Sequence, residues 1–198
     1  MSMLARAPVN GQAAGNAGVL PHFRFAVKLP KVITHDLKLT TAVPELDIFF
    51  GDIAPLAGKL GPVLVQLPPS LAFDGARDAA FCHALRKRCQ GRIVIEPRHV
   101  SWASPDASAI LKQNAIERVY ADPQDPALRD AVDTAGFIYL RLHGAPKIYY
   151  STYSSAELAT AARLLRTAAA GSWCIFDNTA SGAALRNALA LRACPDLA

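Results

Sequence analysis

The sequence predicts an α/β fold in which about six short, parallel strands alternate with flanking helices. Short and nearly continuous apolar runs recur from Phe23 onward, as expected of strands that are covered on both faces. Longer amphipathic stretches separate these runs, which is the pattern of repeated βα units. With 52% hydrophobic and 19% charged residues, the chain of 198 residues is long and apolar enough to form a well-packed domain.

The order of the elements follows from the apolar runs and the breaks between them. Strands are expected over about 23–28, 62–67, 92–97, 117–121, 137–142 and 172–177, and helices over about 41–57, 76–90, 105–114, 155–169 and 182–192. The segment 123–135 contains Pro123 and Pro126 and is expected to be a loop with at most one helical turn. Ser154 and Glu157 have the spacing of a capping box before the fourth of these helices.

Residues 1–22 are rich in Ala, Gly, Asn and Pro and show neither secondary-structure period, so we expect a flexible arm there and one domain over 23–198. Six strands are too few for an eight-stranded barrel, which typically needs about 250 residues. Spacing alone therefore leaves two alternatives, a smaller open sheet or a barrel whose first units are missing.

Composition excludes several classes of protein. The chain has no run near the roughly 18 apolar residues of a membrane span and no apolar core of a secretory signal, and its 4 cysteines form no Cys-x-x-Cys pair, so we expect a cytoplasmic protein. The net charge of +5 is compatible with binding to phosphate groups or nucleic acid, although the basic residues are scattered, which favours a generally basic surface. No P-loop, nucleophile elbow or dinucleotide-binding motif is present.

Charged or amide-bearing side chains follow five of the apolar runs. They are Lys28, Gln66, Glu96 with Arg98, Arg141 with His143, and Asp177 with Asn178. In a parallel α/β barrel, the C-terminal ends of the strands converge on one mouth, where catalysis occurs. We therefore expect the candidate site at these strand ends.

Four of the candidates could move a proton. His143 is the strongest, because histidine changes charge near neutral pH, and His35 is a second acid–base candidate. Glu96 and Asp177 are carboxylates that could act as a base. The alternatives are structural: His143 as a hydrogen-bonded core residue, His35 beside a helix cap, Glu96 in an internal salt bridge, and Asp177 with Asn178 capping the next helix.

The remaining candidates could bind a substrate. Arg98 and Arg141 could grip a phosphate or carboxylate, or could instead pair internally with Glu96 or Asp177. Trp102 could stack on a base or sugar, or could close the core. The other substrate-binding candidates are Lys28, Gln66, Asn178 and Tyr153, the last from a tyrosine-rich loop that resembles a lid. The separations give no metal-ligand signature, and no cofactor is identified.

Five motifs in order carry a resemblance to a known family. They are Phe25-Ala-Val-Lys28 followed by Ile33-Thr-His35, the segment Lys59 to Pro69, Glu96-x-Arg98-x-x-Ser101-Trp102, Arg141-Leu-His143-Gly144, and Phe176-Asp177-Asn178-Thr179. From about Phe23 to Leu189 the chain resembles the YecE-like family, the domain of unknown function 72. The resemblance implies a TIM-barrel-like fold and supplies no activity.

The chain departs from the family pattern at its start. Family members open with a Gly-x-Ser-Gly-Trp-like strand and a Glu-x-Asn-x-x-Phe-Tyr-like stretch, and this sequence shows neither. It therefore resembles a member that lacks about two N-terminal βα units, and open sheet edges would invite homo-oligomer formation. Three functions stay open: an enzyme for a phosphate-bearing substrate such as nucleic acid or a phosphorylated small molecule, a non-catalytic binding or scaffold protein, and an inactive truncated family member.

Overall fold

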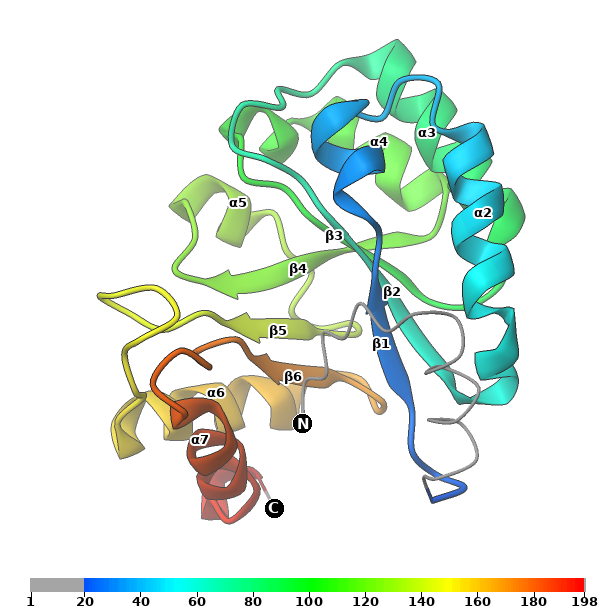
Figure 1. The fold of residues 1–198 in the computed structure, drawn as a ribbon. Helices are drawn as coiled ribbons and strands as arrows, with labels where there is room; N and C mark the ends of the chain where they lie inside the picture. The colour runs from blue at the N-terminus through cyan, green and yellow to red at the C-terminus, as the bar shows by residue number, and fades with distance from the viewer. Residues whose placement is uncertain (1–19, 198) are drawn as a thin grey trace. The chain divides into compact units, whose positions relative to one another are not determined.

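The computed structural model describes residues 20–197, so the arm expected over 1–22 lies outside the described residues except for its last three. The chain divides into two compact units (Figure 1). The N-terminal unit is described over residues 20–116 and the C-terminal unit over 117–197.

The N-terminal unit contains a parallel sheet of three strands, β1 (Phe25–Lys28), β2 (Leu60–Gln66) and β3 (Ile93–Glu96), in the order β1-β2-β3. Strand β3 is buried along its whole length, and β2 is buried over its central apolar residues. This burial on both faces explains why the two strands appear in the sequence as continuous apolar runs. The register places Gln66 beside Glu96, so both polar side chains stand at the same end of the sheet.

Three α-helices accompany this sheet: α2 (Val43–Ile53), α3 (Gly75–Arg88) and α4 (Pro105–Gln113). Helix α2 packs against α3, and α3 packs against α4 (Figure 1). The helix expected over 41–57 is shorter than predicted, because Pro55 disfavours a continued α-helix and the chain turns into a 3₁₀-helix, η2 (Ala54–Lys59). Two further short helices are η1 (Val32–Asp36), a π-helical turn, and η3 (Val100–Ala103).

The C-terminal unit contains three further parallel strands, β4 (Ile116–Asp122), β5 (Tyr139–Leu142) and β6 (Trp173–Phe176), and β5 pairs with both β4 and β6. Its helices are α5 (Pro126–Asp130), α6 (Ser155–Thr167) and α7 (Ala183–Arg192), followed by a short 3₁₀-helix, η4 (Pro195–Leu197). Helix α5 is the single helical turn expected within 123–135. The predicted strands and helices are thus confirmed to within a few residues at their ends.

Alternation along β5 decides which side chains can form a site. Ile138, Leu140 and Leu142 pack in an apolar cluster with side chains of α6 and α7, the helices that lie on one side of β5 and β6 (Figure 1). Because successive side chains of a strand point to opposite faces, Arg141 and His143 lie on the other face. The polar residues are therefore directed away from the helices.

The starts of α6 and α7 differ. Helix α6 begins with the expected capping box, in which Ser154 and Glu157 bond reciprocally to each other's backbone N–H. Helix α7 begins after Gly182, which has a φ of 73° and provides no side-chain cap. The interpretation of Asp177 and Asn178 as helix caps is therefore wrong, because both residues lie before the cap position.

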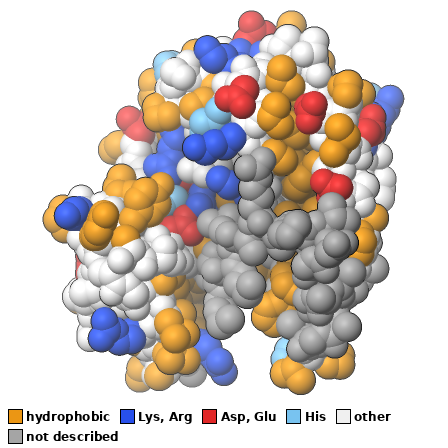
Figure 2. Space-filling view, in the orientation of Figure 1, with side chains coloured by type: hydrophobic (Ala, Val, Ile, Leu, Met, Phe, Trp, Pro, Cys, Tyr) orange, Lys and Arg blue, Asp and Glu red, His pale blue; other side chains and the backbone are white. Residues whose placement is uncertain are grey.

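The surface carries charges of both signs. On the face shown in Figure 2, Lys and Arg side chains occur at several places and are interspersed with acidic and apolar ones.

None of the helices within residues 20–197 combines the length and the hydropathy needed to cross a membrane.

Candidate functional site

The predicted site residues other than Trp102 fall into two groups, each within one compact unit. We call the group in the N-terminal unit the N-terminal cluster; it consists of Lys28, His35, Gln66, Glu96 and Arg98. We call the group in the C-terminal unit the C-terminal cluster; it consists of the predicted residues Arg141, His143, Tyr153, Asp177 and Asn178 together with Asp122, which contacts two of them. Most members of both clusters lie at or just after the C-terminal ends of their strands, as expected.

The C-terminal cluster is built around the carboxylate of Asp177. A guanidinium nitrogen of Arg141 binds its Oδ2, and Nδ1 of His143 lies 3.3 Å from the same oxygen. All three side chains are buried. Arg141 balances the charge of Asp177, so the carboxylate can be buried without leaving an uncompensated charge. The sequence left open whether Arg141 pairs with Glu96 or Asp177, and the structure pairs it with Asp177.

The backbone of His143 is held from two sides. Its N–H donates to the carbonyl of Asp122 at 2.8 Å, and its carbonyl accepts the N–H of Tyr149 at 2.6 Å. The Tyr149 ring meets the His143 ring edge to face, with the ring centroids 6.2 Å apart. Tyr149 belongs to the segment 144–153, which we call the 144–153 loop. This loop therefore covers the histidine.

Tyr153 anchors the end of this loop. Its hydroxyl accepts the N–H of Gly144 at 2.8 Å and donates to a carboxylate oxygen of Asp122 at 3.1 Å. Burial raises the pKa of the Tyr153 phenol, so it stays protonated and can make both bonds. Tyr153 was expected to bind substrate, and the structure shows it buried and engaged in holding the loop.

Asn178 is held by a residue that the sequence analysis missed. Its amide nitrogen donates to the carbonyl of Ser151 at 2.9 Å and to Oδ1 of Asn187 at 2.8 Å. Asn187 lies on the buried face of α7 with Ala183 and Leu191, four residues away in each direction. An amide between two apolar positions of an amphipathic helix is a signal that could have identified it.

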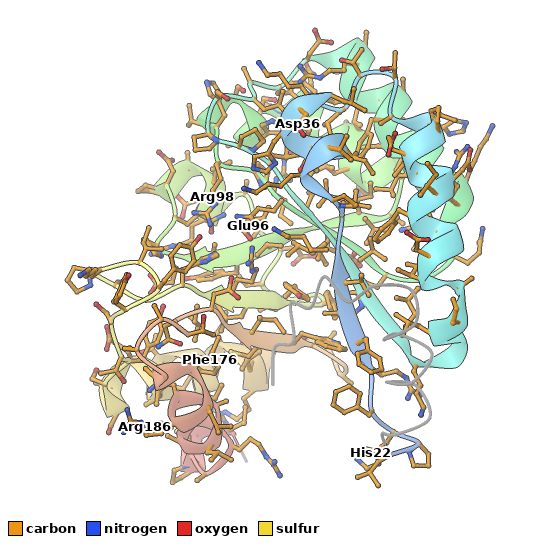
Figure 3. All side chains as sticks on the ribbon, in the orientation of Figure 1. His22, Asp36, Glu96, Arg98, Phe176 and Arg186 are labelled. Carbon is orange, nitrogen blue, oxygen red and sulfur yellow. The ribbon has the colours of Figure 1, made fainter. Side chains whose placement is uncertain are left out.

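In the N-terminal cluster, Glu96 and Arg98 form an ion pair, and Figure 3 shows their side chains next to each other. Glu96 is fully buried, whereas Arg98 is partly exposed. The internal salt bridge between Glu96 and Arg98 that the sequence suggested is therefore present. Beside it, Nζ of Lys28 lies 3.5 Å from Oε1 of Gln66.

His35 lies in the π-helical turn η1, where its Nδ1 is 2.7 Å from the hydroxyl of Thr34. Burial lowers the pKa of His35, and the positive charges of Lys31 and Lys28 lower it further. The imidazole is therefore neutral at pH 7. The same two lysines place positive charge beside His35, and the negative charge of Asp36 opposes their effect on its pKa.

The position of Trp102 does not allow it to stack on a substrate. Its side chain is fully buried, its indole N–H donates to the carbonyl of Leu71 at 3.0 Å, and its ring packs edge to face on Phe73. No face of the ring is exposed for a base or sugar. The geometry fits the alternative, in which Trp102 closes the core.

Among residues 20–197, no group of three or more His, Cys, Asp or Glu side chains is arranged to hold a metal ion.

Comparisons with known proteins identify the fold and the family. A search of curated proteins finds no match. A DUF72 family protein from Thermotoga maritima is 24% identical with a TM-score of 0.80, and the match covers 98% of this chain and 81% of that one. A DUF72 family protein from Enterococcus faecalis is 22% identical with a TM-score of 0.79, over 97% of this chain and 81% of that one.

These likenesses confirm the predicted fold class, an α/β, TIM-barrel-like fold with parallel strands and flanking helices. The model of a family described as "Protein of unknown function DUF72" matches residues 16–196, which is most of the chain. It is the family whose motifs the sequence resembles. The chain therefore belongs to the DUF72 family.

Proposed function

We propose that this protein is an enzyme that acts on a phosphate-bearing substrate and that His143 transfers the proton. The observation that carries the proposal is the buried contact between Asp177 and Nδ1 of His143. A carboxylate oxygen 3.3 Å from Nδ1 favours, through its negative charge, the tautomer with its proton on that nitrogen. In this arrangement Nε2 is the atom that exchanges a proton with the substrate, and Asp177 acts as the positioning group.

Support for an anionic substrate comes from the net charge of the whole chain and, within the N-terminal unit by itself, from the lysines near His35. The positive charges of Lys31 and Lys28 are strong enough at His35 to lower its pKa. The chain carries a net charge of +5. A net positive charge attracts phosphate groups and speeds their encounter with the protein. The substrate class is therefore a phosphate ester, either a small molecule or nucleic acid.

Access to His143 requires the 144–153 loop to act as a lid. Its Tyr149 covers the imidazole, and Tyr149 and Tyr150 are themselves about half exposed. Three hydrogen bonds hold the loop to the segment after β6. They run from the Ala180 N–H to the Tyr149 carbonyl, from the Ser181 hydroxyl to the Tyr150 carbonyl, and from the Asn178 amide to the Ser151 carbonyl. Tyr153, the last residue of the loop, belongs to the apolar cluster beneath β5 and stays in place, so the opening is confined to the part of the loop before it.

The test compares His143→Gln with His83→Gln, because His83 is an exposed histidine on α3. Both variants and the unmodified protein are incubated with phosphomonoesters, phosphodiesters and nucleotides, and turnover is followed by phosphorus NMR. We expect at least one compound to be converted by the unmodified protein and by His83→Gln, and not by His143→Gln. Equal conversion by folded His143→Gln refutes the role of His143.

The second candidate is a non-catalytic binding protein, and the ion pairs favour it. Arg141 with Asp177 and Arg98 with Glu96 satisfy charges that a catalytic site would direct to a substrate. Ligand-dependent thermal stabilisation by phosphate compounds without conversion of any of them would support this reading. Salt-sensitive binding to DNA or RNA would identify a polymer as the ligand.

For protein partners, we propose a second copy of the chain. Among the described residues, β1 pairs with a strand on one side only, which leaves an edge that another strand can join. Light scattering after size-exclusion chromatography tests this, and a monomer at every concentration examined would overturn it.

A further inference from the structure

The strongest unexplained feature of the C-terminal cluster is the side-chain oxygen of Asn178. Asn178 is fully buried, and its Oδ1 receives no hydrogen bond in the structure, although the amide nitrogen of the same side chain makes two. Buried carbonyl groups nearly always accept a hydrogen bond, so this oxygen needs a donor that no residue of the described chain provides, either a bound ligand or a water.

The orientation of the neighbouring amide, that of Asn187, is determined by the backbone of Tyr153. The Tyr153 N–H, which can only donate, lies 3.2 Å from one end of the Asn187 amide, so that end is the oxygen. The Tyr153 carbonyl, which can only accept, lies 3.2 Å from the other end, so that end is the nitrogen. Asn187 therefore cannot be flipped.

The orientation of Asn178 follows from that of Asn187. The end of the Asn178 amide that contacts Oδ1 of Asn187 must be a donor. The same end contacts the Ser151 carbonyl, which also requires a donor. Both contacts place the nitrogen there, so the remaining atom is a carbonyl oxygen that can only accept a hydrogen bond.

This oxygen belongs to the neighbourhood of the proposed proton-transfer group. Asn178 follows Asp177, the residue that contacts His143. A side-chain carbon placed on Gly144, the residue after His143, would lie 3.3 Å from Cβ of Asn178. Asn178 is thus packed directly against the first residue of the 144–153 loop, the proposed lid.

We infer that Oδ1 of Asn178 accepts a hydrogen bond from a hydroxyl group of the substrate, so that the substrate is a phosphate ester with a free hydroxyl. This inference rests on the proposed function. A phosphate oxygen is excluded from this position because it would face another acceptor. An ammonium group would need a nearby carboxylate to compensate its charge, and Asp177 is already paired with Arg141. A neutral hydroxyl satisfies the oxygen without adding charge.

The test uses two ligands with the same phosphate group and carbon chain, glycerol 3-phosphate and propyl phosphate, which differ only in hydroxyl groups. NMR titrations of the full chain follow the side-chain amide signals of Asn178, with those of Asn187 as an internal reference. We expect glycerol 3-phosphate to shift the Asn178 signal and to bind about threefold to tenfold more tightly than propyl phosphate, the range for one neutral hydrogen bond. The preference should disappear in Asn178→Leu.

The outcomes separate this inference from the proposed function. Equal binding of the two esters, with no shift specific to Asn178, overturns the inference alone and means that a buried water satisfies the oxygen. If neither ester binds, the proposed function fails and the inference fails with it. Because the unmodified protein gives the decisive comparison of the two ligands, the result does not depend on whether Asn178→Leu folds.

Discussion

Replacing Gly144 by alanine tests whether the packing of the 144–153 loop onto Asn178 stabilises the protein. Gly144 has a φ of +94°, and an added Cβ would lie 3.0 Å from the Ser151 carbonyl oxygen and 3.3 Å from Cβ of Asn178. Gly171 provides the matched control. Its φ of +85° is similar, and an added Cβ would meet nothing within 4 Å. Both substitutions therefore place alanine at a positive φ, which has a similar energetic cost, but only Gly144→Ala also brings the new Cβ into close contact with other atoms.

The magnitudes follow from these two terms. A non-glycine residue at positive φ costs about 1–2 kcal/mol, and the loss of glycine from the unfolded chain offsets roughly 0.4–1 kcal/mol of that. Gly171→Ala should therefore lower the free energy of unfolding by about 1 kcal/mol. Gly144→Ala should have the same backbone cost and, in addition, a steric cost of roughly 1–3 kcal/mol. The steric cost arises because the new Cβ meets the backbone oxygens of Ser151 and Lys147, which cannot rotate away.

Urea unfolding followed by circular dichroism measures both variants against the unmodified protein. We expect Gly144→Ala to lose roughly 1–3 kcal/mol more than Gly171→Ala. Amide hydrogen exchange should also become faster in the 144–153 loop of Gly144→Ala, because the bond from the Gly144 N–H to the Tyr153 hydroxyl is displaced. Equal losses in the two variants would refute the packing argument.

Three further predictions concern the core and the helix ends. Arg141→Met should cost about 3–5 kcal/mol of unfolding free energy because it leaves buried Asp177 uncompensated, and urea unfolding should show a smaller loss when Asp177→Leu is added. Burial raises the pKa of the Cys82 thiol to about 12, so the unfolded chain loses this proton first and stability falls as pH rises above about 8.5. Urea unfolding in reducing buffer at several alkaline pH values should show a shallower fall for Cys82→Ala; an unchanged fall contradicts this. Ser154→Ala should cost about 1 kcal/mol because it removes the cap of α6, whereas exposed Ser155→Ala should cost little in the same assay.

The alternation of short strands and helices could be predicted because it depends on local properties of the chain. The buried strands β2 and β3 are continuous apolar runs, and the capping box of Ser154 and Glu157 depends on a spacing of three residues. The end of α2 was predicted less well. The sequence indicated a helix up to about residue 57, whereas the α-helix ends at Ile53 and continues as a 3₁₀-helix around Pro55. These are errors at element ends, where local energies differ little.

The candidate site could be predicted only in part. The sequence correctly indicated Glu96 as the internal partner of Arg98, and it named Asp177 among the alternatives for Arg141. It did not show that Tyr153 would be buried, and it left open whether Trp102 would stack on a ligand or close the core. Burial of an aromatic ring depends on residues far away in the chain, so motif spacing does not reveal it.

By itself, the sequence determined the α/β class, the family resemblance and the polar strand ends, because periodicity, turn residues and motifs are properties of neighbouring positions. Only the tertiary structure decided that Arg141 and His143 share one oxygen of Asp177 and that Asn187 orients Asn178. These contacts join residues that are 36, 34 and 9 positions apart. Pairings of this kind depend on strand register and helix packing, which the order of residues along the chain does not display.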